Sequence, residues 1–63
     1  MTVIRIGDGR SASGKILDKE TTWFRLEEKE DAIVEAMKTN KRIYVSRNGK
    51  RYKEITLEQL KAL

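Results

Sequence analysis

The chain opens with segments whose apolar and polar positions alternate as they do in β-strands. In residues 2–6 Ile4 and Ile6 share one face, and residues 21–26 are rich in β-branched and aromatic side chains. A brief apolar pair at 16–17 suits another short strand. The first part of the chain therefore predicts a small antiparallel meander.

From residue 27 the apolar spacing changes to that of a helix. One stripe carries its apolar residues, which are Leu26, Ile33, Ala36 and Met37. Acidic side chains crowd the first turns and lysines the last, as the helix dipole favours, and Asn40 suits the C-terminal end. The pattern predicts a helix over 27–39.

The clearest turn signal is Asn48-Gly49, which separates strand-like runs at 42–47 and 50–55. This dipeptide is typical of a two-residue type I′ hairpin, because both positions need a positive φ. Such a turn places Val45 opposite Tyr52. One face would pack on the core and carry Ile43, Val45 and Tyr52. The other would face water and carry Arg42, Tyr44, Ser46, Arg51 and Lys53.

The last segment predicts a short helix over 57–63. Thr56 and Gln59 have the spacing of a capping box, in which each side chain bonds the backbone of the other residue. Ile55 and Leu60 have the spacing of a hydrophobic staple, which turns Ile55 inward.

These elements predict one small α+β domain over residues 1–63. The N-terminal strands and the hairpin 42–55 form an antiparallel sheet, with helix 27–39 on one face and helix 57–63 closing it. Residues 7–15 would form a mobile loop. The expected core side chains are Ile4, Ile6, Leu17, Phe24, Leu26, Ile33, Met37, Ile43, Val45, Tyr52, Ile55 and Leu60.

The composition of the chain excludes several kinds of catalytic and metal-binding site. The 63 residues include no Cys, His or Pro, which excludes disulfides, a Cys/His zinc site, a thiol nucleophile and a histidine base. So small a chain leaves little room for a pocket, so we expect no enzyme, cofactor, metal or small-molecule substrate. No apolar run is long enough to span a membrane and no signal-peptide pattern opens the chain, so we expect a cytoplasmic protein.

Charge is distributed unevenly along the chain. Residues 38–53 hold seven basic and no acidic side chains, whereas residues 18–37 hold seven acidic and three basic ones. Nucleic acid binding favours clustered Lys and Arg with an aromatic to stack. The candidate contacts are Arg42, Tyr44, Arg47, Lys50, Arg51 and Lys53. The alternative is that these charges keep an exposed strand soluble. Trp23 would anchor a partner or stack a base, or else close the core.

Two other motifs have simpler explanations. Residues 9–15 match G-x-x-x-x-G-K, but Ile16 follows where a phosphate-binding loop needs Ser or Thr, so we expect a turn. The acidic residues at 27–31 are explained by the start of a helix.

Residues 36–63 combine a helix end, a basic hairpin with a polar-Gly tip and a capped helix. This order resembles the small head-completion (head–tail joining) proteins of lambda-type tailed phages. The resemblance implies a helix–hairpin–helix fold and a structural role in a ring at the portal. We expect a non-enzymatic, phage- or mobile-element-like module whose basic hairpin contacts DNA or RNA backbone. The alternatives are a structural head–tail joining protein, or a small protein-interaction or inhibitor module, acting as an oligomer.

Overall fold

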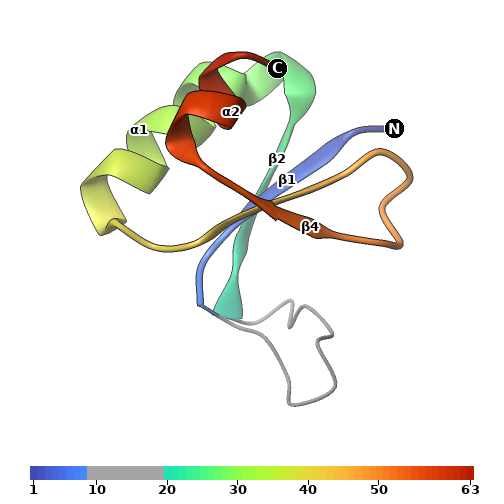
Figure 1. Cartoon of the computed structure of the whole chain (residues 1–63), viewed down its shortest axis with the longest axis horizontal. Coiled ribbons are helices and arrows are strands. Elements are labelled where there is room, and N and C mark those ends of the chain that lie inside the picture. The colour runs from blue at the N-terminus through green and yellow to red at the C-terminus, as the bar shows by residue number, and fades with distance from the viewer. Residues whose placement is uncertain (9–19) are drawn as a thin grey trace.

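A computed structural model of the chain describes residues 1–8 and 20–63, which form a four-stranded antiparallel sheet with two helices packed on one face (Figure 1). The strands are β1 (Val3–Ile6), β2 (Thr22–Arg25), β3 (Ile43–Ser46) and β4 (Lys53–Ile55). The helices are α1 (Lys29–Thr39), preceded by a single 3₁₀ turn (Leu26–Glu28), and α2 (Leu57–Lys61). The predicted α+β class is confirmed. The strand expected at 16–17, Leu17, the motif at 9–15 and most of the loop at 7–15 lie outside the described residues.

The strands lie in the order β2-β1-β3-β4, so β1 and β3 are the inner strands and β2 and β4 the edges. Ile4 pairs with Phe24 on one side and with Val45 on the other. Since β2 and β3 are both antiparallel to β1, they run parallel to each other, and α1 connects them across the sheet as a split β-α-β unit.

The core lies between the sheet and the helices. Its buried members are Ile4, Ile6, Ala32, Ala36, Ile43 and Leu60, and Phe24, Ile33, Val45, Ile55 and Leu57 pack against them. The expectation that Leu26 and Met37 join this core is wrong, because they are 43% and 62% exposed. The buried stripe of α1 passes instead through Ala32 and Ala36, whose small side chains let the helix lie close to the sheet.

The capping box predicted for the last helix is confirmed. The Gln59 amide N–H donates to Thr56 Oγ1 at 3.1 Å, and the Thr56 N–H donates to Gln59 Oε1 at 2.9 Å. Lys29 Nζ, at the start of α1, donates to the carbonyl oxygens of Lys61 and Leu63 at 3.1 and 2.7 Å. Asn40 ends α1 in the left-handed conformation, with φ of 55°, as expected.

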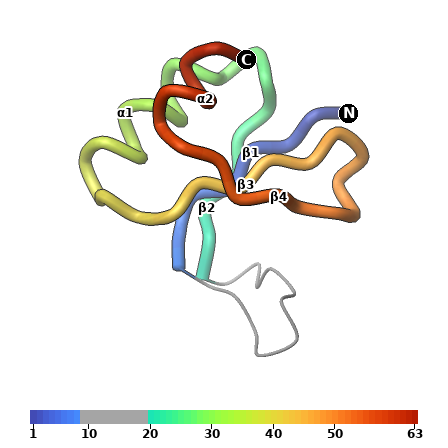
Figure 2. The backbone as a smooth tube through the Cα atoms, in the orientation of Figure 1, coloured from blue at the N-terminus to red at the C-terminus, as the bar shows by residue number. Residues whose placement is uncertain are grey.

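The predicted hairpin register is wrong by one residue. Val45 pairs with Lys53 rather than with Tyr52, and Ile43 pairs with Ile55. The connection is therefore not a two-residue turn but a six-residue loop, residues 47–52, which we call the basic loop. Gly49 has a positive φ of 76° and Asn48 does not, so the type I′ turn is absent. Figure 2 shows this loop as a wide excursion beside the N-terminal end of β1.

The sheet face opposite the helices, which we call the open face, carries a different set of side chains. Phe24 packs on the helix side, so its neighbours Trp23 and Arg25 project from the open face. The cross-strand pairs place the rest of this face beside them: Val3, Arg5, Tyr44, Ser46 and Glu54. Neither helix of the described residues has the length and apolar character needed to cross a membrane.

Candidate nucleic-acid interface

The basic loop is held in shape by two side chains. Ser46 Oγ accepts from the Asn48 and Gly49 N–H groups at 3.3 and 2.8 Å, and it donates to Asn48 Oδ1 at 3.0 Å. Asn48 Oδ1 also accepts from the Lys50 and Arg51 N–H groups at 2.9 and 3.2 Å. These local bonds satisfy the backbone that a tight hairpin would have paired across the strands. The bonds to Asn48 Oδ1 fix the backbone of Lys50 and Arg51, two of the three basic residues of the loop.

The loop also folds back over the sheet. A Cβ placed on Gly49 would lie 4.0 Å from Val3 Cγ2, and Val3 and Ser46 are both buried although they lie on the open face. The end of the open face that adjoins the loop is therefore covered by backbone that carries Arg47, Lys50 and Arg51, and these three side chains are exposed.

The basic run from 38 to 53 does not form one patch. Lys38, Lys41 and Arg42 belong to the C-terminal end of α1 and the residues that follow it. This end of α1 lies on the left in Figure 1, whereas the basic loop lies on the right. The four residues of β3 between them span about 13 Å. The fold thus divides six of the seven basic residues into two clusters at opposite ends of the sheet, and the seventh, Lys53, lies in β4.

Two of the predicted contact residues, Tyr44 and Arg42, interact with neighbouring residues of this chain. Tyr44 is 1% exposed, so the prediction of a solvent-facing ring there is wrong, and Ser46 is likewise buried. The neighbouring Tyr44 hydroxyl and the Glu54 carboxylate raise the pKa of Arg42 above its ordinary value. The Arg42 N–H donates to Asp8 Oδ1 at 3.3 Å. The structure places both residues away from the basic loop.

Because of the register change, Lys53 does not lie on the face where it was predicted. It shares the helix side of the sheet with Val45, and both line a groove with Arg47, Ile55 and Leu63. Tyr52 was expected in the core, but it lies on the open face, where its hydroxyl accepts a hydrogen bond from Arg5.

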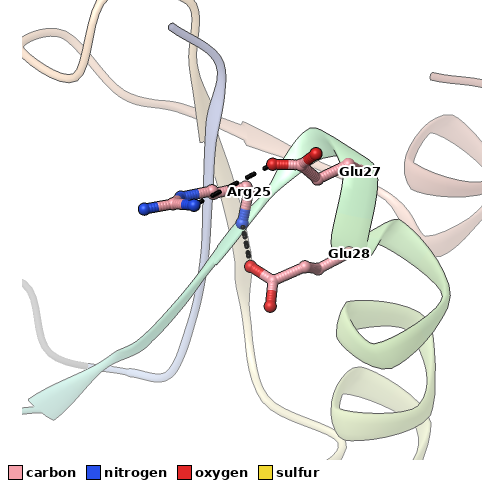
Figure 3. Close-up of polar contacts among 3 residues, drawn as sticks. All are labelled: Arg25, Glu27 and Glu28. Atoms are coloured by element: carbon pink, nitrogen blue, oxygen red, sulfur yellow. Dashed lines mark hydrogen bonds and ion pairs between the residues drawn. The ribbon is translucent and has the colours of Figure 1, made fainter.

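Trp23 is 49% exposed on the edge strand β2. The Arg25 guanidinium lies 5.9 Å from the centroid of its ring, a separation typical of a cation–π contact. Figure 3 shows Arg25 with two acidic residues of the following turn beside it: its Nη1 lies 4.0 Å from Glu27 Oε1, and its backbone N–H donates to Glu28 Oε1 at 3.1 Å. Glu27 therefore offsets part of the Arg25 charge, and about half of the Trp23 surface remains exposed beside the Arg25 guanidinium.

Sequence reasoning missed Arg5 and Tyr52 as members of this surface. Arg5 Nε donates to the Tyr52 hydroxyl at 3.2 Å, Arg5 Nη1 donates to Thr21 Oγ1 at 3.0 Å, and the guanidinium lies 5.7 Å from the centroid of the Tyr52 ring. The alternation around Ile4 did place Arg5 away from the core, which was the available signal. The position of Tyr52 depended on the loop length.

The two layers of the described structure differ in charge. The helical segments 26–39 and 57–63 carry six acidic and three basic side chains, whereas the strands and their connections carry eight basic and three acidic ones. Among the described segments, the sheet layer is therefore the more electropositive of the two. Within the described residues, no cluster of acidic side chains could hold a metal ion.

Comparison with known proteins gives no relative. No family model, curated protein or solved structure matches the chain. The similarity to phage head-completion proteins stays a prediction.

Proposed function

We propose that this protein is a nucleic-acid-binding module that contacts the phosphate backbone through its basic loop. The observation that carries the proposal is the exposure of Arg47, Lys50 and Arg51 on a loop whose backbone is fixed by Ser46 and Asn48. A fixed loop loses little conformational entropy on binding, so more of the attraction between cations and phosphates contributes to affinity.

The arrangement supports contact with the backbone rather than reading of bases in a duplex groove. β3 and β4 pair over only three positions, and the loop folds back beside Val3 instead of projecting as a long ribbon. A ribbon that enters the major groove needs to extend beyond the body of the protein. Phosphates, by contrast, are accessible to a short loop.

Salt dependence tests the proposal with a matched pair of variants. We expect the affinity for nucleic acid, measured by fluorescence anisotropy, to fall steeply between about 50 and 200 mM salt. In K50A/R51A the slope of log affinity against log salt should become shallower by roughly 1.4–1.8, for two lost phosphate contacts. The control K38A/K41A removes the same charge from the other end of the sheet and should keep the slope. Equal effects of the two variants would overturn the assignment to the basic loop, and absence of binding would overturn the function.

A second candidate is self-association, which is favoured by apolar side chains left exposed on the helix layer. Val34 and Met37 are both exposed on α1, and the acidic helices of one copy would attract the basic sheet side of another. Sedimentation velocity should then show an oligomer that V34K/M37K dissociates. A monomer at high protein concentration would rule this candidate out.

A further inference from the structure

We infer that the open face takes single-stranded nucleic acid, with an unpaired base stacked on Trp23; this inference rests on the proposed function. Trp23 is half exposed on the sheet face that the helices leave uncovered, whereas the other aromatic of its strand, Phe24, packs on the core. A large aromatic ring exposed on a sheet is what base stacking requires.

The surroundings of Trp23 suit a polyanion. Along its own strand lies Arg25, and across the sheet it pairs with Arg5, which contacts Tyr52. Arg25 pairs in turn with Val3, the residue beside the tip of the basic loop. A strand of nucleic acid that follows this path would meet one stacking ring and then the loop cations.

The same geometry disfavours a duplex on this face. In a duplex both faces of each base are covered by neighbouring bases, so the indole ring has no base to stack on unless one is unpaired. Trp23 lies on the edge strand and not at the tip of a projecting element, so it is poorly placed to wedge between paired bases. Single strands present their base faces without that cost.

Tryptophan fluorescence provides a direct test, because Trp23 is the only tryptophan in the sequence. A short oligothymidylate should quench its emission and bind more tightly than a duplex of the same length. W23A should weaken the affinity for the single strand roughly 5- to 150-fold, and W23F should weaken it less. The affinity for the duplex should stay nearly unchanged in both variants.

The control is L63A, which removes an exposed apolar side chain that follows α2 and should keep the affinity of the wild type. Circular dichroism would verify that each variant is folded. If W23A binds single strands as tightly as wild type while K50A/R51A does not, the stacking inference fails and the proposed function stands. Preference for the duplex would also overturn the inference. Absence of binding to either nucleic acid overturns both, and quenching of Trp23 by a protein instead would assign this face to a protein partner.

Discussion

Arg5 Nε donates a hydrogen bond to the hydroxyl of Tyr52 at 3.2 Å, and the same guanidinium lies 5.7 Å from the centroid of the tyrosine ring. The two residues are separated by 47 positions in the sequence, yet the pair links the inner strand β1 to the end of the basic loop. Because Arg5 also donates to Thr21, the side chain ties β1, the residue before β2 and the loop together. The open face is thus an ordered surface at this point.

Asn48 should determine the shape of the basic loop. Its Oδ1 accepts three hydrogen bonds, so N48A should lower the free energy of unfolding by about 1–3 kcal/mol, measured by urea denaturation. N48D retains the acceptor oxygen, so its free energy of unfolding should fall much less. If the loop contacts phosphate as proposed, N48A should also weaken nucleic acid binding. Equal stability of N48A and wild type would contradict the role of these bonds.

Gly7 and Gly49 should tolerate alanine differently. A Cβ at Gly7 would lie 2.3 Å from the Glu20 carbonyl oxygen, whereas one at Gly49 has no neighbour closer than 4.0 Å. G49A should cost about 1–2 kcal/mol because of its positive φ alone, and G7A should cost more because backbone atoms must also move. Thermal unfolding of both variants measures the difference. A smaller loss in G7A than in G49A would show that the turn at Gly7 relaxes freely.

The capping box should contribute to the stability of α2, which is too short to persist without packing and caps. T56A removes the acceptor for the Gln59 N–H and should destabilise the protein by about 1 kcal/mol. T56S retains the hydroxyl and serves as the control. Guanidinium denaturation of the three proteins measures the effect, and identical midpoints for T56A and T56S would refute it.

The buried stripe of α1 should be sensitive to volume, unlike its outer face. Ala32 is fully buried, so A32L should overpack the contact with the sheet and cost about 1–3 kcal/mol. M37A on the exposed side should change stability by less than about 0.5 kcal/mol. The free energies of unfolding of these two variants distinguish the observed stripe from one through Met37. A large loss in M37A would contradict it.

Much of the fold could be predicted because its signals are local. The alternation in β1, the end of α1 at Asn40 and the capping box at Thr56 each depend on residues within a few positions, and all three are present. The rotation of α1 was harder, since Ala36 and Met37 both suit an apolar stripe by hydropathy. Only the distance to the sheet decides that the smaller side chain faces inward.

The candidate site was predicted in part. The basic residues of the loop were found because charge is read directly from the sequence. The sequence left Trp23 open between a partner contact and the core, and in the structure it lies on the face opposite Phe24. The hairpin register was predicted wrongly. Asn48-Gly49 favours a tight turn, but the side chains of Ser46 and Asn48 offer the backbone alternative hydrogen bonds. The resulting register shift of one residue exchanged the faces of Tyr52 and Lys53.

The sequence by itself determined the elements, their caps and the strong charge of the segment 38–53, since these follow from neighbouring residues. The tertiary structure alone decided which cations share a surface: β3 carries Arg42 to one end of the sheet and the basic loop to the other. It also decided that Tyr44 is buried and that Arg5 joins Tyr52. Such relationships depend on the pairing of distant strands, where a shift of one residue moves every side chain to the opposite face.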